Sequence, residues 1–132
     1  MSKIVVGYDG SEASRHALER AAELAQGDPV IVVSAVHRLV SRGGGYDRVE
    51  ADEHRRHLEE AETRLAELGV ADVRTTEDVG DPATVIANEA EANGADLIIV
   101  GSEEKNLLER LFGGSVSAGV IRKAKTEVLV VH

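Results

Sequence analysis

The chain has 132 residues and a formal net charge of -9, from 24 acidic and 15 basic side chains. This length predicts one domain, residues 1–132, that can bury a core without disulfides. Cysteine is absent, which excludes disulfides, a thiolate nucleophile and a cysteine-ligated zinc site. The acidic balance and an aromatic content of 2% argue against nucleic-acid binding, because that function needs a basic face or stacking platforms.

The apolar runs are also too short to cross a bilayer, and no signal peptide is evident. We therefore expect a cytoplasmic protein that has no membrane partner.

Strand-like and helix-like segments alternate along the chain. The predicted strands span residues 4–6, 30–36, 73–79, 97–100 and 128–131. The predicted helices span residues 12–26, 47–68, 82–93 and 116–124. Helices of this length between strands imply right-handed βαβ units and an open parallel sheet with helices on both faces. The fold class is therefore α/β.

Local signals support the helix boundaries. Ser11 and Asp81 occupy N-cap positions, and Pro82 suits the first position of its helix. The apolar line of the first helix is Ala13, Ala17, Ala21, Leu24 and Ala25. The apolar line of the second helix is Leu58, Ala61, Leu65 and Leu68. The strand at 73–79 alternates only weakly, and its polar members predict a position near a sheet edge.

In open parallel sheets, ligands bind beyond the carboxyl ends of the strands where the strand order reverses. If the first and fourth strands are neighbours, Asp9 and Gly101 face each other across that place. Asp9 can bind a ribose hydroxyl or a metal ion that accompanies phosphates, but it can equally be a turn aspartate before Gly10. The glycines at 101, 113 and 114, with Ser115 and Ser117, can cradle phosphates or form an ordinary strand-to-helix connection.

No catalytic residues emerge from the sequence. His54 and His57 lie three residues apart on a charged helix without an evident third ligand, and we expect them on a solvated helix face. A P-loop and a nucleophile elbow are both missing from the sequence. If the protein has any enzymatic activity, we expect at most slow hydrolysis of a nucleotide.

Three segments resemble the universal stress protein family: residues 4–11, Gly80-Asp81-Pro82, and the final third from Gly101 onward. The resemblance implies a five-stranded parallel sheet of order 3-2-1-4-5. It also implies a homodimer paired through the C-terminal strand, and a division between members that bind ATP and members that do not.

Members that bind ATP carry Gly-x2-Gly-x9-Gly-Ser/Thr, and this chain reads Gly101-x2-Glu104-x9-Gly114-Ser115. By matched position, Asp9 contacts the ribose or its Mg²⁺ or Mn²⁺ ion, and Ala35 lies beside the adenine. The residues matched to ribose and phosphate binding are Gly101, Gly114, Ser115, Val116 and Ser117.

The glutamate at position 104 leaves two hypotheses open. One is a stress-response protein that binds an adenine nucleotide, because three of the four motif positions match. The other is a nucleotide-free dimeric scaffold that acts through protein partners, because Glu103 and Glu104 repel phosphate. A phospho-acceptor receiver or a pyrophosphatase-type synthetase fits less well, since their signature residues are missing from the strand ends.

Overall fold

The computed structural model describes residues 3–36, 48–102, 120 and 124–132. The strands are β1 (Ile4–Gly7), β2 (Val30–Val36), β3 (Val73–Val79), β4 (Leu97–Gly101) and β5 (Glu127–Val131). The helices are α1 (Glu12–Ala25), α2 (Arg48–Glu67) and α3 (Pro82–Asn93). All five predicted strands and the first three predicted helices are therefore confirmed, and no boundary differs by more than one residue.

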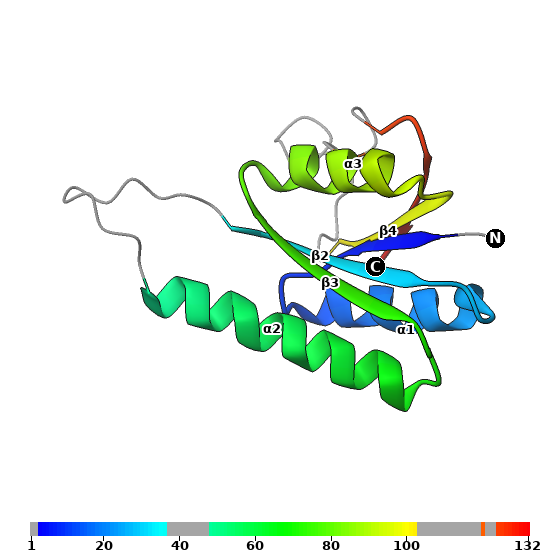
Figure 1. Cartoon of the computed structure of the whole chain (residues 1–132), viewed down its shortest axis with the longest axis horizontal. Coiled ribbons are helices and arrows are strands. Elements are labelled where there is room, and N and C mark those ends of the chain that lie inside the picture. The colour runs from blue at the N-terminus through cyan, green and yellow to red at the C-terminus, as the bar shows by residue number, and fades with distance from the viewer. Residues whose placement is uncertain (1–2, 37–47, 103–119, 121–123) are drawn as a thin grey trace.

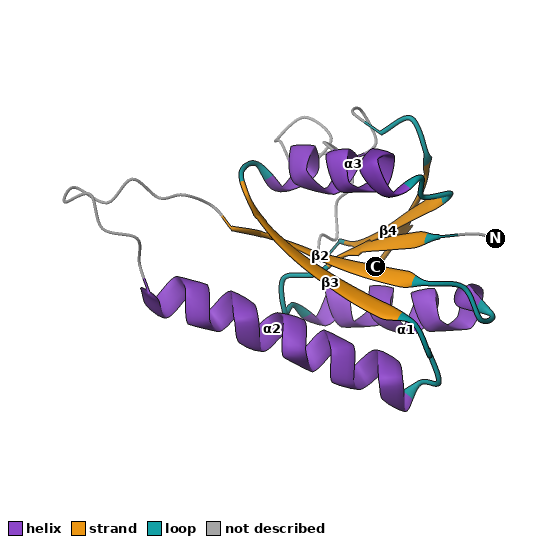
Figure 2. Ribbon diagram, in the orientation of Figure 1, coloured by secondary structure: helices purple, strands orange, loops and turns teal. Residues whose placement is uncertain are grey.

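The five strands form one parallel sheet in the order β3-β2-β1-β4-β5. Helices cover both faces: α1 and α2 lie on one side of the sheet, and α3 lies on the other (Figure 1). The strand order and the two-sided cover agree with the expectation from the sequence. Figure 2 shows the same alternation of strand and helix along the chain.

Two apolar clusters, one on each face of the sheet, form the core. Alternate strand residues point to opposite faces, so Ile4 and Val6 pack with α1 and α2 while Val5 packs with α3. Leu18 of α1 and Leu65 of α2 are fully buried in the first cluster. Ile98 of β4 is fully buried in the second cluster. The central strands are thus apolar on both faces, as their uninterrupted β-branched runs predict.

The predicted helix caps are present. The Ser11 side chain accepts a hydrogen bond from the backbone N–H of Ser14, and Asp81 accepts one from Thr84, with Pro82 at the start of α3. The predicted helix at 116–124 lies almost wholly outside the described residues. Within it, the backbone N–H of Ala124 donates to the carbonyl of Val120 over 2.8 Å, which is the spacing of a helical turn.

Two predicted core residues are wrong. Leu24 is 40% exposed and Leu68 is 36% exposed. Leu24 lies seven residues after Ala17, on the same face as the buried alanines, but in the last turn of α1, which ends at Ala25, and there the cover is incomplete. Leu68 follows the end of α2 at Glu67, where the chain leaves the helix and the helical period no longer applies. Strand β3 lies at a sheet edge, as predicted.

Gly101 lets β4 approach α1 closely. A Cβ atom at this position would lie 2.4 Å from the backbone carbon of Ala13, 2.5 Å from its oxygen and 2.6 Å from the nitrogen of Ser14. A side chain here would collide with the first turn of α1 itself. Gly7 of β1 differs, because its Cβ would meet the Cδ1 atom at the end of the Ile86 side chain at 2.6 Å.

We predict that Gly101→Ala lowers the free energy of unfolding by about 3 kcal/mol, and Gly7→Ala by only about 1 kcal/mol. Backbone atoms of a helix cannot move aside alone, whereas an isoleucine side chain can change rotamer. Urea unfolding of both variants at neutral pH measures the difference. Equal losses for the two variants would contradict the contact between β4 and α1.

Candidate functional site

Strands β1 and β4 separate at their carboxyl ends. Their pairing ends at Val6 with Ile99. Beyond it, the N–H of Tyr8 donates to the carbonyl of Val33 in β2 over 3.0 Å, and the N–H of Ser102 donates to Val131 in β5 over 2.8 Å. The segment after β1 therefore continues toward β2, and the segment after β4 continues toward β5, at the opposite edge of the sheet. We call this place the switch point, and it is where ligands bind in open parallel sheets.

The first turn of α1 closes one side of the switch point. The near-contact of Gly101 with Ala13 and Ser14 places the amino end of this helix directly beside the end of β4. Backbone N–H groups at a helix amino end carry a partial positive charge that favours anions. The amino end of α1 thus adds partial positive charge to the switch point, where the sequence predicts ligand binding.

Asp9 organises the turn between β1 and α1. Its Oδ1 atom accepts a hydrogen bond from the backbone N–H of Ser11 over 2.9 Å. Ser11 in turn caps the helix, since its Oγ accepts from the N–H of Ser14 over 3.2 Å and its carbonyl accepts from the Ser14 hydroxyl over 2.9 Å. The Asp9 side chain is therefore both held by the turn and exposed to solvent.

The Asp9 carboxyl is stabilised in its ionised form. Burial raises its pKa, but hydrogen bonds from the side chain and backbone of Ser11 and from the Ser14 side chain outweigh burial, and the pKa lies below its ordinary value. An exposed, ionised carboxylate beside a helix amino end is suited to accept from ribose hydroxyls or to join the oxygen ligands of Mg²⁺.

The structure places three of the seven predicted site residues. Gly101 is the last residue of β4, and Asp9 follows the end of β1 by two residues; these are the two strands that separate at the switch point. Ala35 is half-buried near the end of β2 and packs against the cluster on the α3 side. The other four predicted residues, Gly114, Ser115, Val116 and Ser117, lie outside the described residues, as does Glu104.

The surroundings of the Asp9 turn differ from what the sequence predicts. His54 and His57 do not lie on a solvated helix face, and that prediction is wrong. Both side chains are half-buried and point to the sheet, where His54 Nδ1 and Ser34 Oγ lie 2.9 Å apart. The Tyr8 ring, 5% exposed, lies 6.3 Å from the His57 ring. A signal was available in the sequence. Residue 54 lies four residues before Leu58, and residue 57 lies four residues before Ala61, so both histidines share the helix face of the apolar line.

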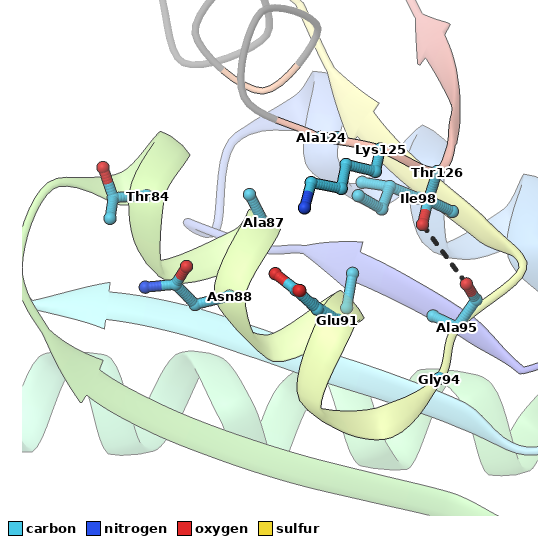
Figure 3. A pocket seen from close by; sticks show the side chains of 11 residues that line it. Thr84, Ala87, Asn88, Glu91, Gly94, Ala95, Ile98, Ala124, Lys125 and Thr126 are labelled. Carbon is cyan, nitrogen blue, oxygen red and sulfur yellow. Dashed lines mark hydrogen bonds between the residues drawn. The ribbon is translucent and has the colours of Figure 1, made fainter.

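A separate pocket of about 300 Å³ lies between α3 and the residues that lead into β5 (Figure 3). Its floor is apolar and includes Ala87 and Ile98, and Glu91 and Lys125 supply opposite charges. Thr126 Oγ1 donates to the carbonyl of Ala95 over 3.4 Å at its edge. None of the predicted site residues that the structure describes lines this pocket, so it is distinct from the switch point.

The described residues contain no group of three or more histidine, aspartate or glutamate side chains that could hold a metal ion. No helix in the described ranges has both the length and the apolar character needed to cross a bilayer.

The strand order and the switch point suggest a family relationship, and the comparison with protein families identifies it. Residues 1–132 match the universal stress protein family over the whole chain. The chain belongs to this family. A universal stress protein of Mycobacterium tuberculosis is 30% identical over 138 residues, covering 98% of this chain and 94% of that protein. A putative universal stress protein of Staphylococcus aureus is 32% identical over 137 residues, covering 98% and 82%.

Solved structures of universal stress proteins share the fold. A universal stress protein in complex with cAMP has a TM-score of 0.82 and 30% identity, covering 99% of this chain and 97% of that chain. The Archaeoglobus fulgidus universal stress protein in complex with dAMP has a TM-score of 0.78 and 27% identity, covering 100% and 98%. The structures of these two relatives contain the adenine nucleotides cAMP and dAMP.

We predict that Asp9→Ala lowers the free energy of unfolding by about 1 kcal/mol at neutral pH, since it removes the acceptor that holds the turn. A lowered pKa in the folded state stabilises the protein only while the carboxyl is ionised. The difference between wild type and variant should hold above the ordinary aspartate pKa of about 3.9 and shrink as the pH falls through the lower folded-state value.

Urea unfolding across this pH range measures the effect. Asp9→Asn is the matched control, because its amide oxygen can still accept from Ser11 but does not titrate. A stability difference between wild type and Asp9→Ala that stays constant down to the lowest pH would contradict the role given to the ionised carboxylate.

Proposed function

We propose that this universal stress protein binds an adenine nucleotide, with ATP as the expected ligand, at the switch point between β1 and β4. The observation that carries the proposal is the separation of these strands, with Asp9 at the end of one and Gly101 at the end of the other. Support comes from two relatives of the same fold whose structures contain cAMP and dAMP. Three of the four positions of the ATP motif also match.

Each predicted residue has a chemical role in this proposal. The Asp9 carboxylate accepts hydrogen bonds from the ribose or joins the ligands of a Mg²⁺ or Mn²⁺ ion. Ala35 is small enough to leave room for an adenine ring at the end of β2. Gly101, Gly114 and Ser115 offer backbone and hydroxyl donors to phosphate, and the residues that follow, 116 and 117, complete the motif.

Glu104 opposes phosphate binding in two ways. It replaces a glycine, so backbone at this position can no longer adopt a positive φ freely. Its carboxylate also repels phosphate: one pair of like charges about 5 Å apart, at an effective dielectric of about 20, costs roughly 3 kcal/mol. That is on the order of a hundredfold in affinity. Lys105, Arg110 and a bound divalent cation offset part of this repulsion.

The alternative function is a nucleotide-free dimeric scaffold that acts through protein partners. The sequence observation that favours it is the pair of carboxylates, Glu103 and Glu104, in the phosphate motif. Micromolar binding of ATP by the wild-type protein would exclude this alternative.

We predict that Glu104→Gly strengthens the binding of Mg-ATP by about a hundredfold and that of AMP by less, since the repulsion acts mainly on the added phosphates. Isothermal titration calorimetry with both nucleotides measures the change. Glu104→Gln separates the two causes because it removes the charge and keeps the side chain. Glu59→Gln, on the exposed side of α2, controls for the change in net charge. Absence of binding to wild type and Glu104→Gly at millimolar nucleotide would overturn the proposal.

We also propose a homodimer that pairs through β5. Among the described strands, β5 is at a sheet edge and carries four consecutive large apolar residues, 128–131, all only half-buried. An edge strand with this composition invites pairing with a second copy. In this proposal each subunit of the dimer is a single domain, residues 1–132.

We predict that Val130→Lys shifts the protein from dimer to monomer in sedimentation velocity, because a charged side chain on an edge strand opposes pairing. Val79→Lys is the matched control, since Val79 is 52% exposed on the opposite edge. Circular dichroism verifies that both variants are folded. A dimer that survives Val130→Lys but not Val79→Lys would place the interface on β3 instead.

A further inference from the structure

A cluster of three rings lies at the carboxyl ends of β1 and β2. It consists of Tyr8, His54 and His57, and we call it the ring cluster. The Tyr8 and His57 rings are 6.3 Å apart at an interplanar angle of 87°, and the His54 and His57 rings are 6.2 Å apart at 78°. These are edge-to-face arrangements, which stabilise ring pairs. The bond between His54 and Ser34 anchors the cluster to β2.

The ring cluster fixes where α2 lies at this end of the sheet. Tyr8 belongs to the chain that leaves β1, and the two histidines come from one face of α2. Burial raises the pKa of the Tyr8 hydroxyl, and a hydrogen bond from Arg15 of α1 partly offsets this. Residues of β1, β2, α1 and α2 therefore all meet at the ring cluster.

His57 lies directly against the turn that carries Asp9. A Cβ atom at Gly10 would lie 2.7 Å from Nε2 of His57 and 2.9 Å from both Cδ2 and Cε1. The tip of the imidazole ring thus points at the Cα of Gly10. Gly10 is the middle residue of the turn that the hydrogen bond from Ser11 to Asp9 closes. Its φ of +83° is also one that side chains rarely adopt.

The burial of the His57 ring at this place is partly unfavourable. Its Nδ1 atom is buried and has no hydrogen-bond partner among the described residues. A buried polar atom without a partner is unfavourable, and such atoms need an explanation. Filling space alone does not supply one, since a leucine would fill the space without a buried nitrogen but has no flat ring whose tip meets Gly10. The contact with the turn offers an explanation.

We propose that His57 is a positioning residue for the Asp9–Gly10–Ser11 turn, and through it for the nucleotide site, so that this inference rests on the proposed function. The imidazole tip prevents Gly10 from moving toward α2. The turn then keeps the Asp9 carboxylate at the end of β1, beside the start of α1. The ring acts through the turn and does not touch the nucleotide.

The test is a double-mutant cycle at positions 10 and 57, read by calorimetry with AMP. His57→Ala frees the turn, and we expect it to weaken AMP binding about tenfold. Gly10→Ala places a methyl group against the ring and also weakens binding. In Gly10→Ala with His57→Ala the collision is absent, so this variant should bind AMP more tightly than the product of the single effects predicts.

Further variants separate positioning from structural packing. His57→Phe keeps a ring against Gly10 and should restore AMP affinity to within about threefold of wild type. Arg56→Ala changes an exposed neighbour on α2 and should leave the affinity unchanged. If His57→Ala does not fold, His57→Asn shortens the side chain with a smaller loss of volume. Additive effects in the cycle, or a loss of stability without a loss of affinity, would overturn the proposal.

A measurement without nucleotide keeps this inference apart from the proposed function. The ¹³Cα and carbonyl ¹³C chemical shifts of Gly10 and Ser11 report the backbone conformation of the turn and are little affected by the ring current of a neighbouring side chain. They should change in His57→Ala and return toward wild-type values in His57→Phe. If wild type binds no nucleotide, the proposed function fails, and these shifts still decide whether His57 positions the turn. Unchanged shifts in His57→Ala would refute the positioning role.

Discussion

The candidate site depends on the close approach of β4 to the first turn of α1. This approach is available only because residue 101 is a glycine, whose missing side chain leaves room for the backbone of Ala13 and Ser14. Since α1 also follows directly from β1, the contact brings the carboxyl ends of two strands and the amino end of a helix together. Strands β1 and β4 then separate toward β2 and β5, and the switch point lies where they part.

Most of the fold could be predicted because its signals are local. Uninterrupted β-branched runs distinguish the buried strands, and Ser11, Asp81 and Pro82 define helix starts through their own hydrogen bonds or fixed geometry. The polar β3 could be placed at an edge because its side chains need water. Leu24 was placed wrongly because helical periodicity gives the direction of a side chain but not how far the cover extends, and Leu68 because the helix ends before it.

The candidate site was less predictable because its parts are distant in sequence. Asp9 and Gly101 could be paired through the strand order that the family resemblance implies. Nothing in the sequence indicated that the His57 ring reaches Gly10, since this depends on how α2 crosses the sheet. A histidine among charged residues on a helix is typical of a solvated face. Only the packing of α2 against β2 and β3 shows that this histidine is instead half-buried.

The Asp9 turn is therefore supported from both sides. The backbone N–H of Ser11 donates to the carboxylate, and Ser11 is itself fixed as the N-cap of α1 by its bond with Ser14. The ring cluster lies against Gly10 from the side of α2. For the proposed nucleotide site, two independent supports suit a carboxylate that has to stay ionised and in place, because a misplaced negative charge would repel phosphate instead of binding the ribose or the cation. In a chain with net charge -9, the position of this one carboxylate would decide whether it helps or opposes the proposed nucleotide.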